Sequence, residues 1–266
     1  MAMAKPAEPG AIKEIAEELS QNNYLFRGLD VAELSEVLAT GEVTPQKLYS
    51  GRSVYTAFRP DTSIASLYVV SNGGPVILRS APLDRIIAIT YPGSCFGMRN
   101  LALGYGRVSR SFPSLVEAYK TTDAIEIDLD IIKTLHAENE TFRDRYDYLF
   151  ELREKFQYHL LNCSTHPPQA VAALLRGLIY QERSLLNQPQ ADGIYVFDLP
   201  IDIIAHVAQL NHRTVEQVLK GMRKQGLLLP PQNDDSSDDI VRVCDPEGLK
   251  EVYSATRDKV SWWPLR

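Results

Sequence analysis

Residues 211–225 gather amide, hydroxyl and cationic side chains into one short segment. Arginine can place two N–H groups on guanine, glutamine can do the same with adenine, and hydroxyl or amide groups can bind phosphate oxygens. Four cations against the lone Glu216 leave this segment with a local charge of +3, although the whole chain carries −6. The segment therefore predicts an anionic partner, double-stranded DNA. The candidate DNA contacts are Asn211, His212, Arg213, Thr214, Gln217, Lys220 and Arg223.

Two helices, at about residues 201–208 and 213–225, are predicted to position those side chains. The inward apolar residues are Ile204 and Val207 in the first, and Val215, Val218, Leu219 and Met222 in the second. The Ile204-Ala205 pair is followed ten residues later by Thr214-Val215, which is the spacing of a helix-turn-helix. That motif presents the start of its second helix to the major groove. A plain helical hairpin with a solvated charged face is the alternative that this pattern leaves open.

A β-wing is predicted after the second helix. Residues 226–228 lead through a loop to a strand-like run at 240–244. The loop, residues 233–239, carries four aspartates where phosphate contacts would favour cations. The wing therefore strengthens the prediction of DNA binding, whereas its acidic tip weakens it.

The N-terminal half alternates short β-rich runs with turn residues. The runs are 53–58, 66–70, 76–78, 86–91, 115–119 and 124–129, separated by turns such as Pro60-Asp61 and Pro92-Gly93. Strands this short and this evenly spaced predict a barrel or jelly roll. Ahead of them, helical spacing over residues 11–40 predicts two helices that are broken at Asn22-Asn23, with Asp30 as the N-cap of the second.

A long helix is predicted between the two halves, over about residues 135–163. Its apolar residues fall at three- and four-residue steps, interrupted by Arg153, and are Tyr146, Leu149, Phe156, Leu160 and Cys163. So long a stripe predicts a coiled-coil seam and a homodimer through the helix at 135–165. A single amphipathic helix lying on its own domain is the alternative. Residues 165–168, Thr-His-Pro-Pro, are predicted to end the helix and form a hinge.

Length and composition set wider limits. A chain of 266 residues predicts two domains. It has no apolar run near the roughly 20 residues of a membrane span and no signal core at the N-terminus, so we expect a cytoplasmic protein without a membrane partner. Cys95, Cys163 and Cys244 form no C-x-x-C pair, so neither a metal site nor an iron–sulfur cluster is predicted. No P-loop, nucleophile elbow or H-E-x-x-H motif is present, so we do not expect an enzyme.

The order of β-roll, long helix, hinge and winged helix resembles the Crp/Fnr family of transcription regulators over about residues 24–245. Three segments carry the resemblance: residues 49–76 with Gly51, Asp61 and Gly73-Gly74, residues 89–103, and residues 203–228. The resemblance implies an α+β fold with an N-terminal double-stranded β-helix (jelly-roll) domain, a dimerisation helix and a C-terminal winged helix-turn-helix. The implied parts are an N-terminal extension at 1–23, a sensor domain at 24–134, the dimerisation helix at 135–165 and a DNA-binding domain at 166–266. A near-palindromic DNA site is implied, and RNA polymerase is a further candidate partner.

The ligand site departs from the family pattern. Members that bind cyclic AMP carry Gly-Glu-Leu at the phosphate cassette and Arg-Ser on the next strand. The matching residues here are Gly97-Met98-Arg99 and Phe112-Pro113. Met98 cannot accept the ribose hydroxyl, and Phe112-Pro113 cannot pair with the phosphate. Cyclic AMP is therefore not expected to bind in the usual way, haem has no good ligand pair, and the cofactor stays unknown. Candidate residues for another anion, such as an organic acid or a nucleotide, are Gly97, Arg99, Arg107 and Arg110, with solvated loop arginines as the alternative.

The DNA-reading residues depart as well. The family's Arg-Glu pair followed by Arg becomes His212-Arg213 followed by Gln217, which implies a different target sequence. A second hypothesis treats the chain as a family fold that has become a protein-interaction module with weak or no specific DNA binding. The acidic loop, the replaced ligand residues and Trp262-Trp263 favour it.

Overall fold

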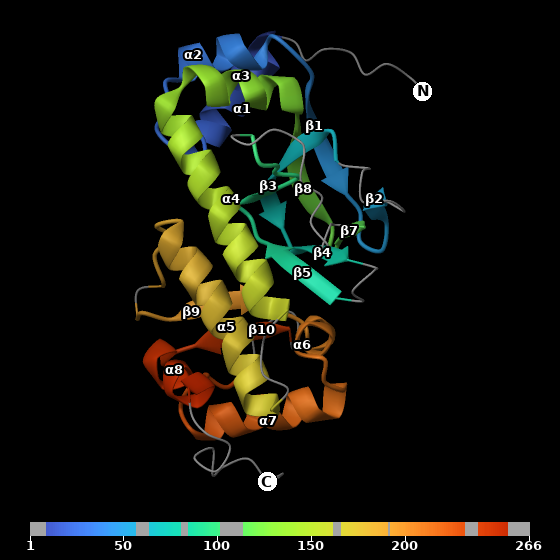
Figure 1. Ribbon diagram of the computed structural model, residues 1–266, viewed down its shortest axis with the longest axis vertical. Coiled ribbons are helices and arrows are strands. Elements are labelled where there is room, and N and C mark those ends of the chain that lie inside the picture. The colour runs from blue at the N-terminus through green and yellow to red at the C-terminus, as the bar shows by residue number, and fades with distance from the viewer. Residues whose placement is uncertain are drawn as a thin grey trace. The chain divides into compact units, whose positions relative to one another are not determined.

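The computed structural model describes residues 9–56, 64–80, 85–101, 114–161, 166–190, 192–231 and 239–254. It combines helices and sheets in two compact units (Figure 1). The first unit comprises Met1–Asp84 and Ala88–Glu154, and the second comprises Arg85–Ile87 and Lys155–Arg266. Among the helices of the described residues, none has the length and hydropathy that a membrane crossing requires.

Two helices open the first unit, as predicted. Helix α1, Pro9–Asn22, packs against α2, Val31–Leu38, and buries Ile12, Ile15, Ala16 and Leu19. The side chain of Asp30 accepts hydrogen bonds from the backbone N–H groups of Ala32 and Glu33, which confirms it as the N-cap of α2. Asn23, at the predicted break, is buried, and its side chain donates to the carbonyl of Gly93 at 3.0 Å.

Two four-stranded sheets form the body of the first unit. One has the order β1-β8-β3-β6, from Val43–Leu48, Thr122–Asp128, Ser66–Gly73 and Cys95–Phe96. The other has the order β2-β7-β4-β5, from Ser53–Thr56, Leu115–Ala118, Val76–Ser80 and Arg85–Thr90. Side chains alternate between buried and partly exposed positions along β7 and over Ile125–Asp128 of β8, as expected for strands with one face on a core. The six predicted runs all overlap strands, whereas β1 and β6 were not predicted.

The prediction of one long helix over residues 135–163 is wrong at its start. The structure has two helices there, α3 at Leu129–Glu138 and α4 at Glu140–Leu161. Asn139 leaves the helical conformation between them, and its side-chain oxygen accepts from the backbone N–H of Phe142 at 2.9 Å. This bond satisfies a donor that the start of a helix leaves open, so the break is locally stabilised. Cys163 and Thr165 lie outside the described residues.

The apolar stripe of α4 is covered by the chain itself. Tyr146, Leu149, Phe156 and Leu160 are each at most 4% exposed in the single chain. In the first unit the ring of Phe142 contacts that of Phe26, with centroids 5.2 Å apart. These four residues are therefore already covered in the single chain, as in the alternative of a helix lying on its own chain, and the homodimer stays a prediction.

Helix α5, Pro167–Ser184, is the central helix of the second unit. It is buried on most sides and packs against α6 (Ile201–Ala208), α7 (His212–Lys224) and α8 (Pro246–Ser254). Pro167 and Pro168 occupy its first positions, where a missing N–H costs nothing. Strand β9, Tyr195–Asp198, pairs antiparallel with β10, Ile240–Val243. No strand was predicted at β9.

Candidate nucleic-acid interface

A tight turn at residues 209–211 joins α6 to α7. Gln209 takes the left-handed conformation, with φ +53° and ψ +46°, and the N–H of Leu210 donates to the carbonyl of Ala205 at 2.9 Å. Apolar side chains of both helices are buried, as predicted: Ile204, Val207, Val215, Val218, Leu219 and Met222. The turn and this shared core hold the two helices as one piece of the second unit.

Asn211 caps the start of α7. Its side-chain oxygen accepts from the backbone N–H of Thr214 at 2.9 Å. The first N–H groups of a helix carry a partial positive charge and attract anions. The cap therefore uses the oxygen of Asn211, and its amide N–H₂ is the part suited to a phosphate contact.

The exposed side of α7 is cationic. Arg213, Gln217, Lys220 and Lys224 follow one another at steps of four, three and four residues, so they share one face of the helix. All four are exposed, and the buried residues of α7 lie on the opposite side. We call these four residues the cationic face of α7. Thr214 and Arg223 are half-buried beside it, and the Nε of Arg223 is withdrawn from solvent.

His212 lies beside an acidic residue of the preceding helix. Its Nε2 lies 3.1 Å from Oδ1 of Asp202, in the first turn of α6. Both side chains remain more than half exposed, at 60% for His212 and 54% for Asp202. The sequence had marked His212 but not Asp202, because the two residues are ten positions apart and meet only when the turn folds.

The two strands of the small sheet flank the helix pair in sequence, because β9 precedes α6 and β10 follows α7. Leu228 bridges to Val243, and the N–H of Leu229 donates to the carbonyl of Arg242 at 3.0 Å, so the segment after α7 lies along β10. Three of the four loop aspartates, Asp234, Asp235 and Asp238, lie outside the described residues, as do Trp262 and Trp263. The carbonyl of Asp239 accepts from the N–H of Leu199 at 2.8 Å.

Gly97 and Arg99 have structural roles in the first unit. Gly97 has φ +88°, and a Cβ there would lie 2.3 Å from the carbonyl oxygen of Ser66, so the close approach to β3 needs glycine. The backbone N–H of Arg99 donates to the hydroxyl of Tyr146 at 2.9 Å, and its guanidinium donates to the carbonyl of Ile64. The other predicted anion contacts, Arg107 and Arg110, lie outside the described residues, together with Phe112-Pro113.

Arg153 interrupts the apolar stripe of α4 because it reaches two hydroxyl groups in the first unit. Its guanidinium donates to Ser94 Oγ at 2.8 Å and lies 3.4 Å from Thr90 Oγ1, and its Nε is buried without a partner. Burial lowers the pKa of this guanidinium. Burial also raises the pKa of the neighbouring Cys95 thiol to about 11, and the positive charge of Arg153 opposes that shift. The sequence pattern showed only an interruption here.

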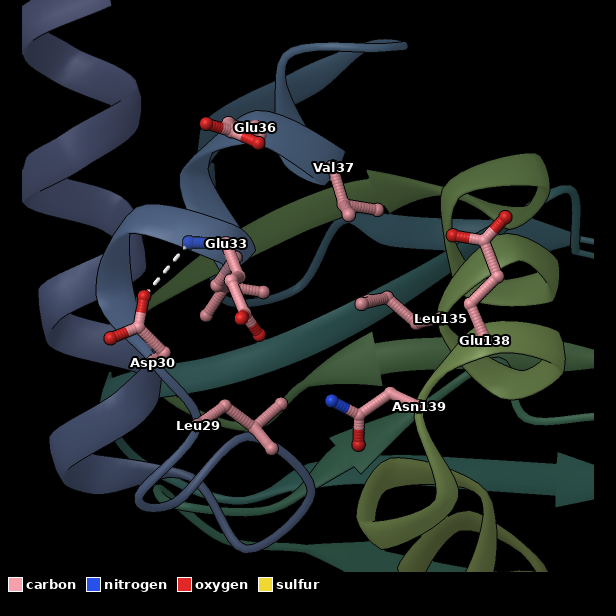
Figure 2. Close-up of a pocket in the computed structure, with 9 residues that line it drawn as sticks. Leu29, Asp30, Glu33, Glu36, Val37, Leu135, Glu138 and Asn139 are labelled. Atoms are coloured by element: carbon pink, nitrogen blue, oxygen red, sulfur yellow. Dashed lines mark hydrogen bonds between the residues drawn. The ribbon is translucent and has the colours of Figure 1, made fainter.

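A cavity of about 260 Å³ opens between α2 and α3 (Figure 2). Its walls are apolar at Leu29, Val37 and Leu135, while Glu33, Glu36 and Glu138 line it with carboxylates. Such a lining disfavours an anion, so this cavity does not suit the anionic effector expected from the sequence.

Comparisons with known proteins bear on the fold. No family model matches the sequence, and no curated protein matches it. Among solved structures, FixK2 from Bradyrhizobium japonicum aligns with a TM-score of 0.56 and 19% identity, over 80% of this chain and 98% of that chain. A double mutant of CooA from Carboxydothermus hydrogenoformans aligns with a TM-score of 0.54 and 18% identity, over 80% and 88% of the two chains. Both are Crp/Fnr regulators, and at such identities the likeness concerns the fold, so the predicted resemblance is confirmed at that level: the chain has the Crp/Fnr fold.

Proposed function

We propose that this chain is a sequence-specific DNA-binding transcription regulator and not an enzyme. In this proposal α6, the turn at 209–211 and α7 are a helix-turn-helix, and β9, β10 and residues 227–229 form its wing. The observation that carries the proposal is the cationic face of α7, which is exposed over three helical turns and backed by a buried apolar side.

Each polar residue of α7 has a role that its chemistry supports. Arg213 can donate two hydrogen bonds to guanine, and Gln217 can exchange two with adenine, both in the major groove. Lys220 and Lys224 lie further along the same face and suit phosphate oxygens. The side chain of Thr214 and the amide of Asn211, at the helix start, suit the phosphate that the helix N-terminus attracts.

A homodimer fits this function. Two copies of α7 would enter successive major grooves about 34 Å apart and would read a near-palindromic site. Because the apolar stripe of α4 is buried in the single chain, we place the seam on the exposed side of that helix. This side carries Asp144, Tyr148, Glu151, Lys155 and Tyr158 at alternating four- and three-residue steps.

The first unit is proposed to be a jelly roll of two sheets that does not bind cyclic AMP in the usual way. The fold family includes members that do bind it, but Met98 stands here where those members carry glutamate. A thioether is too weak an acceptor to replace that carboxylate. The guanidinium of Arg99 is also directed to a backbone carbonyl of its own unit.

The experiment is a selection of bound fragments from a genomic DNA pool, run with wild type, Arg213→Ala and Gln217→Ala. We expect a near-palindromic motif from wild type. Each variant should lose roughly 1–3 kcal/mol of the preference for one base at a defined position of that motif. Lys250→Ala is the matched control, because it removes an exposed cation of the same unit on α8 rather than α7. Sequence-blind binding that survives Arg213→Ala would favour the protein-interaction module instead.

A further inference from the structure

The cavity between α2 and α3 is lined by carboxylates and by no cation. Glu33, Glu36 and Glu138 contribute exposed carboxylates, and neither Lys nor Arg is among the described residues that line it. None of these three carboxylates forms an ion pair with another residue that the structure describes. Like charges around one cavity repel each other, so a cation that enters it relieves this repulsion.

The same cavity has apolar walls, formed by Leu29, Val37 and Leu135. Val37 from α2 and Leu135 from α3 point into the gap between the two helices (Figure 2). Leu34 also lines the cavity, and Leu34 and Leu135 are only 2% and 4% exposed, so core residues support these walls. A volume of about 260 Å³ is small for a ligand pocket and suits a molecule with a short aliphatic chain. An inorganic cation would leave this apolar surface in contact with water, so the lining favours an organic cation.

Asn139 adds a hydrogen-bond donor to the cavity. Its side-chain oxygen accepts from the backbone N–H of Phe142 at 2.9 Å, so the other end of the amide is the N–H₂ group. That group has no acceptor among the described residues, and Figure 2 shows it turned toward Leu29. Its complement in a ligand is an oxygen that accepts hydrogen bonds. The neighbouring carboxylates disfavour another negative charge, so a neutral carbonyl or hydroxyl oxygen fits better than an acid.

We propose that this cavity binds a small aliphatic amine that also carries a neutral hydrogen-bond acceptor. The ammonium group pairs with Glu33, and the acceptor takes the N–H₂ group of Asn139. The aliphatic chain lies against Leu29, Val37 and Leu135. The expected ligand is therefore opposite in charge to the anion that the sequence predicted. All of these residues belong to the first unit, so the inference does not rest on the proposed reading of DNA.

The first test uses leucinamide as the probe, because it joins an ammonium group, a branched aliphatic chain and a neutral carbonyl. Backbone amide shifts of the full chain would be followed by NMR at neutral pH while the probe is added. We expect shifts over α2 and α3. N-acetyl-leucinamide, which lacks the charge, and leucine, which adds a carboxylate, should each bind at least about tenfold more weakly, and isoamylamine, which lacks the carbonyl, about threefold to tenfold. The inference is overturned if leucinamide leaves α2 and α3 unchanged, or if its acetylated form binds equally well.

The second test separates this site from a general attraction of cations to an acidic protein. Glu33→Gln should weaken leucinamide binding at least about tenfold, since it removes the charge that pairs with the ammonium group. Glu14→Gln makes the same change at an exposed position of α1 outside the cavity, so its effect should stay below about twofold. Equal losses in these two variants would overturn the inference.

Asn139→Asp tests the proposed acceptor. This variant keeps an oxygen for the backbone N–H of Phe142 and removes only the N–H₂ donor, so α4 should still begin at the same place. It should abolish the preference for leucinamide over isoamylamine, and the comparison of two amines cancels the effect of the added charge. A preference that survives Asn139→Asp contradicts the proposed contact.

Discussion

At the scale of single residues, two positions depart from ordinary chemistry. Gln209 holds a left-handed backbone conformation without being glycine, and Cys95 is a fully buried thiol close to the buried guanidinium of Arg153. Each departure has a cost that a single substitution can reveal. Each therefore tests whether the residue sits where the structure places it.

The turn between α6 and α7 should become more stable when Gln209 is replaced by glycine. An L-residue in the left-handed region costs about 1–2 kcal/mol, and glycine removes most of that cost while adding some chain entropy to the unfolded state. We expect Gln209→Gly to raise the free energy of unfolding by about 1 kcal/mol in urea titrations. Gln225→Gly is the control, because Gln225 caps α7 with φ −85° and should gain nothing. A destabilised Gln209→Gly would show that the turn has another conformation.

The Cys95 thiol should make stability depend on pH in the alkaline range. Its pKa is about 11 in the folded chain against an ordinary value of 9.0, so the unfolded chain loses this proton first as the pH rises. The contribution of the protonated Cys95 thiol to the free energy of unfolding is therefore fully present below about pH 9. It is lost as the pH rises toward 11, by at most about 1.4 kcal/mol per pH unit. Urea titrations at several pH values should show a shallower decline in Cys95→Ala than in wild type. Equal slopes would contradict the burial, and Cys244→Ala, at a partly exposed thiol, should match wild type.

At the scale of elements, the contact between α4 and α5 in the second unit depends on a missing side chain. A Cβ at Gly177 of α5 would lie 2.7 Å from Cε2 of Phe156 and 3.4 Å from Cδ2 of His159. Nearby, Nε2 of His159 lies 2.9 Å from the carbonyl of Ala173. Glycine is therefore kept inside a helix, where alanine would otherwise be favoured by about 1 kcal/mol.

Gly177→Ala should destabilise the chain although it improves helix propensity. Overpacking of a filled contact costs about 1–3 kcal/mol, which exceeds the gain in propensity. Thermal or urea unfolding would measure the loss. Gly177→Ala should cost less free energy of unfolding in a Phe156→Leu background than in wild type, because the ring edge is gone. If Gly177→Ala is stabilising, then Phe156 does not pack on Gly177.

The elements also show which parts of the fold can be predicted from sequence. Helix α6 begins and ends at the predicted residues, because its apolar spacing and the turn after it are local signals. Strands β1, β6 and β9 were missed since β1 contains Pro45, β6 has two residues, and β9 has only four residues and follows a polar stretch. The candidate contacts of α7 followed from residue type and spacing, whereas Asp202 and Arg153 lie beside partners that only folding brings near. The apolar stripe of α4 was visible, but periodicity cannot tell what covers a stripe.

At the scale of the whole molecule, the proposed seam on α4 predicts the state of association. Tyr158 is 71% exposed, so Tyr158→Glu should fold normally while placing two like charges in the seam of a dimer. We expect the dissociation constant of the dimer to rise at least about tenfold in sedimentation equilibrium, since an interfacial aromatic commonly contributes more than 1 kcal/mol. Tyr180→Glu is the control, because Tyr180 is 58% exposed on α5 and lies outside the seam. A dimer that tolerates Tyr158→Glu would place the seam elsewhere.

The most direct test of DNA reading compares two fragments of equal length, the selected site and a scrambled version of it. Fluorescence anisotropy would give the affinity of wild type and Arg213→Ala for each at one fixed salt concentration. We predict that wild type prefers the site by about a thousandfold or more, and that Arg213→Ala loses roughly tenfold or more of that preference while keeping its affinity for the scrambled fragment nearly unchanged. Equal affinity of wild type for the two fragments would contradict the account, because the cationic face of α7 would then bind phosphates without reading bases.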